Sequence, residues 1–165
     1  MINSSEPKPQ GEAIPGLSQD LQMVGQYINA RIKDTEFTIG YKERDKQRIE
    51  AEPAEAELDI EEEAEALGLD RRGREAWKEQ HLSPDFLQEQ IDDLKKQRAH
   101  RVSLLEGLKK GEFEECVAYL RNRLNAMEQS EQLTTFGMTS PQYKEKHHAE
   151  TRVLRQYIAL LESKR

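Results

Sequence analysis

The amino-acid sequence predicts an all-α protein, elongated in shape, with a long N-terminal helix and a C-terminal antiparallel three-helix unit. Three observations predict this class. Apolar residues recur at spacings of three and four along most of the chain. Two Ser-Pro pairs mark helix starts. Hydrophobic and charged residues each make up 35% of the chain, which is enough apolar surface for stripes along helices but little for a thick core.

Residues 1–17 are expected to form a flexible arm. The first sixteen hold three of the six prolines and two of the nine glycines, and this polar composition leaves nothing to bury. They contain no apolar segment of the kind that a signal peptide requires. No run in the chain approaches the roughly 18 apolar residues of a membrane span, so no membrane partner is expected.

Residues 18–82 are expected to hold three helices, of which the first is long. Ser18 is suited to cap its start, and charged residues continue at helical density to about Glu50, with a kink plausible at Gly40. At about 1.5 Å per residue this helix spans roughly 50 Å and outreaches the C-terminal unit. Part of its apolar stripe should therefore need cover from a partner. The candidate partner-binding residues are Leu21, Val24, Ile28, Ile32, Phe37 and Ile39.

An acidic block follows. Between Glu50 and Glu65 there are nine carboxylates and no basic residue, within a chain whose net charge is −7. Pro53 fits the first position of a second helix that ends at Gly68. The block is interpreted as a solvated helix, as a contact for a basic partner or, least favoured, as a cation site.

The next segment, from Ala64 to Trp77, resembles a helix-turn-helix in the spacing of its alanine, turn glycine and tryptophan. Asp70 is suited to cap a short basic helix there. The resemblance implies contacts with nucleic-acid phosphates from Arg71, Arg72 and Arg74. The acidic helix before them would oppose the approach of DNA, so this function is the alternative rather than the leading one.

Residues 83–165 are expected to form the three-helix unit, with turns at Gly111 and at residues 134–139. Ser83-Pro84 and Ser140-Pro141 share one device, in which serine caps the helix and proline takes its first position. The apolar side chains expected to point inward are Ile91, Leu94, Leu105, Phe113, Leu120, Leu124, Leu154, Ile158 and Leu161.

Catalytic, cofactor-binding and metal-binding residues are not indicated by any motif. Cys116, the single cysteine, sits on an apolar stripe next to glutamates, which would raise its thiol pKa. His147 and His148 are expected at the surface or at the rim of the core, because they lie in a Lys-rich first turn and one Glu-x-x-His spacing alone does not build a di-iron site.

The sequence therefore predicts a non-enzymatic helical interaction or assembly protein that associates with itself or within a larger assembly. Small helical components of phage-like particles have this general build, and the expected location is cytoplasmic, or within a virion. One alternative is a nucleic-acid-associated adaptor, such as a packaging or regulatory subunit. The other is an acidic inhibitor that presents residues 50–65 to a basic protein surface.

Overall fold

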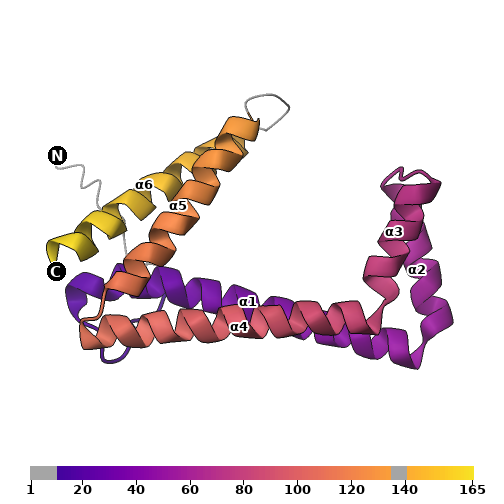
Figure 1. Cartoon of the computed structure of the whole chain (residues 1–165), viewed down its shortest axis with the longest axis horizontal. Helices are drawn as coiled ribbons and strands as arrows, with labels where there is room; N and C mark the ends of the chain where they lie inside the picture. The colour runs from indigo at the N-terminus through magenta and orange to yellow at the C-terminus, as the bar shows by residue number, and fades with distance from the viewer. Residues whose placement is uncertain (1–10, 135–140) are drawn as a thin grey trace. The chain divides into compact units, whose positions relative to one another are not determined.

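The computed structural model describes residues 11–134 and 141–165, and the all-α class predicted from the sequence is confirmed there. A short 3-10 helix, η1 (Gln19–Leu21), leads into α1 (Gln22–Ala51). The remaining helices are α2 (Pro53–Ala66), α3 (Arg71–Leu82), α4 (Pro84–Lys110), α5 (Glu114–Thr134) and α6 (Pro141–Ser163) (Figure 1). The described residues contain no strand. None of the helices in this part of the chain has both the length and the apolar character needed to cross a membrane.

The chain divides into two compact units. One consists of Met1–Asn29 and Ser103–Arg165, and the other of Ala30–Val102. The division falls inside α1 and α4 rather than at residue 83, so the first part of α4 belongs with the second unit. Independent folding of residues 83–165 stays a prediction.

Local chemistry explains where several of the helices begin and end. Pro53 occupies the first turn of α2, and the Asp70 carboxylate accepts a 2.7 Å hydrogen bond from the Gly73 N–H at the start of α3, both as predicted. After α2 the chain turns at Gly68, whose φ is 68°. The Leu69 N–H then donates back to the Ala64 carbonyl, which is the Schellman arrangement that satisfies the end of a helix. Gly111 ends α4 in the same left-handed conformation.

The three serine caps predicted at other helix starts have different outcomes. Ser83 is confirmed as the cap of α4, because its Oγ accepts a 3.2 Å hydrogen bond from the Phe86 N–H. Ser18 precedes η1, but its hydroxyl donates to the Asp20 carboxylate instead of capping the backbone. Ser140 lies outside the described residues.

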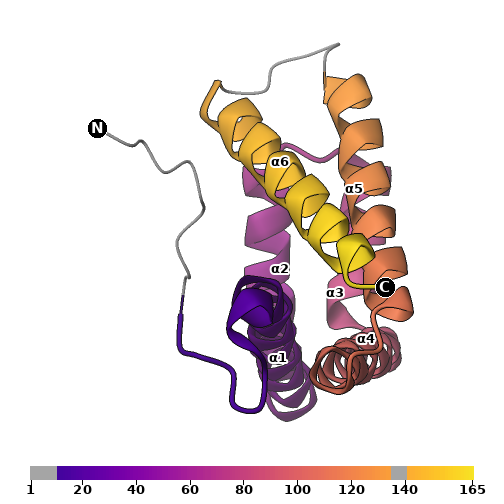
Figure 2. The same cartoon turned by 90° about the vertical axis from the view of Figure 1, so that its left-hand side faces the viewer.

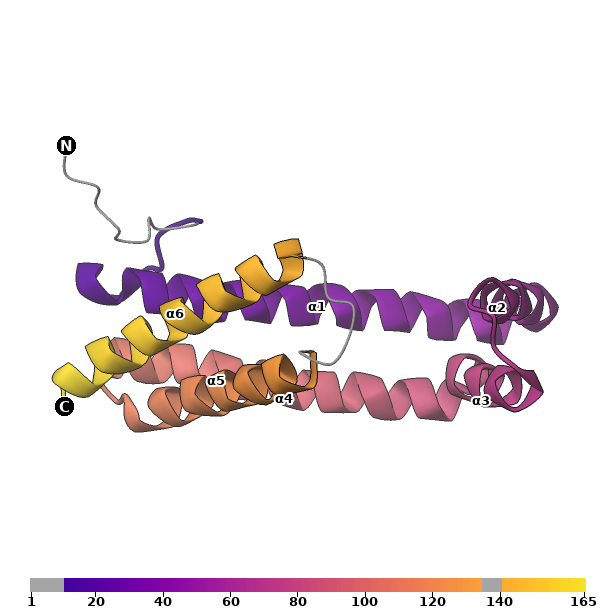
Figure 3. The ribbon, with the colours of Figure 1, turned by 90° about the horizontal axis from the view of Figure 1, so that it is seen from above.

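In the unit formed by residues 30–102, the second part of α1 and the first part of α4 lie side by side in opposite directions (Figure 3). Arg98 on α4 bonds to Glu36 on α1 at 2.8 Å, and Lys42 on α1 donates to Gln90 on α4 at 2.8 Å. Helices α2 and α3 form an antiparallel hairpin in the same unit. The buried side chains of this unit are Ile32, Thr35, Ile39, Ala56, Ala64, Leu87 and Ile91.

In the other unit, α5 and α6 form a second helical hairpin (Figure 2), accompanied by the first turns of α1 and the last turns of α4. Five apolar side chains in the core of this unit are fully buried: Val24, Leu108, Leu120, Leu154 and Leu161. Of the nine side chains predicted to point inward, five are buried within the chain and Leu94, Leu105, Phe113 and Leu124 are half-buried. The predicted loop at residues 134–139 lies, except for Thr134 at the end of α5, outside the described residues.

The expectation of a flexible arm with nothing to bury is wrong for residues 11–17. Ile14 and Leu17 are buried, and the Gln22 side chain accepts from the Ile14 N–H at 2.7 Å while donating to the carbonyls of Ile14 and Leu17. A Cβ at residue 25 would collide with the Leu17 side chain, so Gly25 makes room for this segment. Gln22 thus satisfies three backbone groups of a segment that has no helix or strand, and the Gln26 side chain donates to the carbonyls of Gly11 and Glu12.

We predict that Leu120→Ala lowers the free energy of unfolding by about 2–5 kcal/mol, because it opens a cavity at a fully buried position. Urea denaturation followed by circular dichroism measures this loss. Leu58→Ala is the matched control, since Leu58 is exposed and its truncation should cost no more than about 0.5 kcal/mol. Equal effects of the two substitutions would contradict the description of the core.

Removal of the α4 cap should have a smaller effect. We predict that Ser83→Ala costs about 1 kcal/mol of stability because the Phe86 N–H loses its acceptor. Ser83→Asp, which retains an acceptor, should stay close to the wild type, and Ser103→Ala, at an exposed position within α4, should not destabilise. The same denaturation assay would argue against the cap if Ser83→Ala were neutral.

Candidate functional site

The candidate site is an exposed face of α1 within residues 30–51. Six residues at alternating spacings of four and three are exposed along it, and we call them the outer stripe: Ala30, Asp34, Phe37, Tyr41, Arg44 and Arg48. Phe37 is 71% exposed and Tyr41 is 56% exposed. Two aromatic rings one turn apart on an exposed helix face are costly to leave in water and are typical of contact surfaces.

The contact with α4 explains why this face is left outside. The side of α1 that faces α4 carries Thr35 and Ile39, which are buried, and Lys42 and Lys46, which bond to Gln90 and Gln88. Because successive residues of a helix are about 100° apart, positions 37 and 41 lie on the side of the helix opposite position 39. The pairing that buries Ile39 therefore turns both rings outward.

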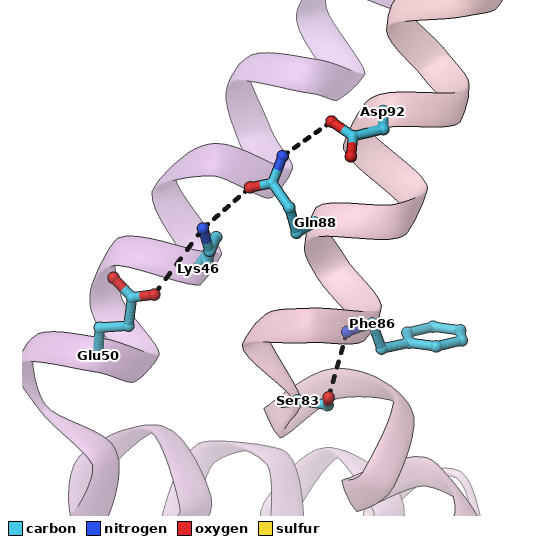
Figure 4. A network of polar contacts seen from close by, with 6 residues as sticks. All are labelled: Lys46, Glu50, Ser83, Phe86, Gln88 and Asp92. Carbon is cyan, nitrogen blue, oxygen red and sulfur yellow. Dashed lines mark hydrogen bonds and ion pairs between the residues drawn. The ribbon is translucent and has the colours of Figure 1, made fainter.

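Polar contacts hold this pairing near the end of α1. Figure 4 shows Lys46 between Gln88, to which it donates at 2.9 Å, and Glu50, which lies 3.9 Å away. The Gln88 amide donates in turn to Asp92 at 2.9 Å. Further along, the Arg101 guanidinium donates to the Arg31 carbonyl at 3.3 Å and to the Thr35 hydroxyl. These contacts fix the rotation of α1 about its own axis relative to α4 in this unit.

One of the three charged residues of the outer stripe forms an ion pair within the described part of the chain, and the other two do not. Arg48 pairs with Asp59 of α2, and this partner raises the pKa of the Arg48 guanidinium through hydrogen bonding and charge. Asp34 and Arg44 form no ion pair with any residue that the structure describes. Tyr41 and Arg48 also border a pocket of about 390 Å³ that includes Phe86. The middle of the stripe thus offers two rings and two opposite charges to a partner.

Only one of the six predicted partner-binding residues is exposed. Phe37 is exposed, whereas the other five are buried within the chain and do not form a free surface: Leu21, Val24, Ile28, Ile32 and Ile39. Uncovered apolar surface on α1 was expected along the main apolar stripe, but it lies on the opposite face. No partner contact was predicted for Asp34, Tyr41 or Arg44, although the spacing between Phe37 and Tyr41 is itself a detectable signal.

The acidic block forms α2 and the residues next to it, and most of its carboxylates are exposed. Lys78 on α3 lies 3.9 Å from Glu57 and also contacts Glu61, and its hydrogen bond with Glu61 raises the pKa of the Lys78 ammonium. One face of α2 combines Glu55, Glu62 and Glu65 with Leu58, which is 60% exposed.

The three arginines predicted for nucleic-acid contact are exposed near the start of α3. Arg71 lies 3.5 Å from Glu75, and Arg74 Nε donates to the Leu69 carbonyl at 2.9 Å. Helices α2 and α3 run antiparallel (Figure 1), whereas the two helices of a helix-turn-helix cross at about 90–120°. The arginines also lie next to the acidic helix, so this arrangement gives the nucleic-acid hypothesis no added support.

Two groups with catalytic or metal-binding potential, Cys116 and His147, are buried. Burial raises the pKa of the Cys116 thiol to about 12. Cys116 borders a pocket of about 690 Å³, and its thiol is protonated there. The prediction of a surface position is wrong for His147, which is buried and donates from Nε2 to the Met127 carbonyl at 2.7 Å. Within the described ranges, no group of three or more His, Cys, Asp or Glu side chains is arranged to hold a metal ion.

Comparison of the chain with protein-family models, with curated proteins and with solved structures finds no match.

We predict that native Cys116 does not react with thiol reagents at about pH 8, because the thiolate is the reactive species and burial suppresses it. Reaction should become rapid once the protein is unfolded in denaturant. Ser163→Cys, which places a second thiol at an exposed position, is the control and should react in the native state. Rapid labelling of wild-type protein under native conditions would show that the thiol is accessible.

Proposed function

We propose that this protein is a non-enzymatic helical interaction protein that associates with itself through the outer stripe of α1. The observation that carries the proposal is the exposure of Phe37 and Tyr41 on the face of α1 opposite its contact with α4. Aromatic side chains are enriched at the centres of protein interfaces, where they contribute much of the binding energy.

Two features support self-association over catalysis. Cys116 is protonated at neutral pH, and the His147 ring is held by a backbone carbonyl, which leaves neither poised for nucleophilic or acid–base chemistry. The outer stripe, in contrast, carries both apolar rings and charges of both signs, as a surface that binds its own copy requires. A role as a small structural or assembly component of a phage-like particle extends this proposal and rests on the helical build alone.

A second candidate is binding of a basic protein surface by α2, as an acidic inhibitor would do. It is favoured by the exposed face on which Leu58 lies among Glu55, Glu62 and Glu65. Such a face offers an apolar contact surrounded by negative charge, which complements a basic partner with a small apolar depression.

We predict that the wild-type protein forms a dimer or a larger multimer at micromolar concentration. The double variant Phe37→Ser, Tyr41→Ser should shift the mass to that of a monomer, because both rings leave the interface. Leu58→Ser, which changes an apolar side chain of similar exposure on α2, is the matched control and should associate as the wild type does. Sedimentation velocity on the full chain measures all three.

A monomeric wild type, or a double variant with unchanged mass, would overturn the proposal. Loss of association in Leu58→Ser alone would place the self-association interface on α2 and overturn its assignment to the outer stripe.

A further inference from the structure

We infer that two copies of this chain pair antiparallel along α1, with Phe37 of each copy against Tyr41 of the other and Asp34 of each against Arg44 of the other. The inference rests on the proposed function, since it assumes that the outer stripe binds a second copy. It adds the direction and the register of the pairing.

The register follows from the symmetry of the stripe. Phe37 and Tyr41 lie two residues before and two residues after position 39, and Asp34 and Arg44 lie five before and five after it. A two-fold axis that passes beside position 39 therefore brings each residue opposite its symmetric counterpart in the second copy. The alternating spacings of four and three are those of a coiled-coil seam, in which antiparallel helices meet layer by layer.

Charge complementarity selects the second copy as the occupant. Both Asp34 and Arg44 are exposed, and neither has an ion-pair partner among the described residues. Neighbouring charges of α1 on the side toward α4 are used inside the chain: Glu36 with Arg98, and Glu43 with Lys95. The antiparallel register supplies Asp34 and Arg44 with opposite charges, twice in each dimer.

The same charges disfavour a parallel arrangement. In a parallel pair in register, Asp34 would face Asp34 and Arg44 would face Arg44 of the second copy, and like charges brought together at an interface oppose association. At the centre, an antiparallel pair stacks four aromatic rings between the two charged layers. Aromatic pairs prefer offset or edge-to-face contact, which facing helices allow.

The test is a charge-swap series in the full-length protein, measured by analytical ultracentrifugation at low salt with circular dichroism as the check on folding. Asp34→Arg and Arg44→Asp should each raise the dissociation constant of the dimer by about tenfold or more, because each places like charges in both outer layers. The double variant Asp34→Arg, Arg44→Asp restores opposite charges in both layers and should return to within about threefold of the wild type.

The outcomes separate this inference from the proposed function. Wild-type protein that associates while both single variants associate equally well would overturn the register and leave self-association standing. Weakened single variants without recovery in the double variant would likewise overturn it. Wild-type protein that stays monomeric would overturn both claims.

Cysteine cross-linking gives a second readout, which reports which positions of the two copies face each other. The variant Asp34→Cys, Arg44→Cys should form a covalent dimer on mild oxidation, whereas Asp34→Cys alone should not, because position 34 faces position 44 in the antiparallel pair. Wild-type protein controls for Cys116, which is buried. Efficient cross-linking of Asp34→Cys alone would indicate a parallel pair and contradict the inference.

Discussion

The contact between α1 and α4 within residues 30–102 determines which face of α1 is left exposed. The chain has few apolar residues for its length, so only one side of α1 in this unit is buried. Helix α4 packs against that side, which carries Ile39. Once that side is buried, helical geometry places Phe37 and Tyr41 on the opposite side. The exposed rings are thus a consequence of the intramolecular pairing, and the candidate site cannot be separated from the fold that produces it.

Electrostatics then determine how the remaining surface is used. Acidic residues are densest on α2, where Lys78 of α3 and Arg48 of α1 neutralise part of the charge. Exposed ion pairs of this kind contribute little to stability, but they commit the basic residues nearby. Arg44 lies one turn before Arg48 and forms no ion pair with any described residue. Its positive charge on the outer stripe is therefore open to an intermolecular contact.

Local sequence rules predicted the helix boundaries because the chemistry there is local. Pro53, Gly68, Asp70 and Ser83 each act on neighbouring backbone groups, so their effects can be deduced without knowledge of the fold. One failure is local, since the Ser18 hydroxyl donates to Asp20 instead of capping, and the others involve partners outside the neighbouring turn. Gln22 orders residues 11–17 across a loop, and His147 is buried through a carbonyl on another helix. The outward face of α1 was not predictable for the same reason, since it depends on where α4 packs.

Hydrogen–deuterium exchange across a dilution series of the full-length protein reports both whether the protein associates and which segment is involved. If two copies pair along α1, amide protection in residues 30–48 rises with protein concentration, while protection in α2 and α3 stays constant. Protection of α1 that is independent of concentration, or a concentration-dependent change confined to α2 and α3, would contradict this pairing.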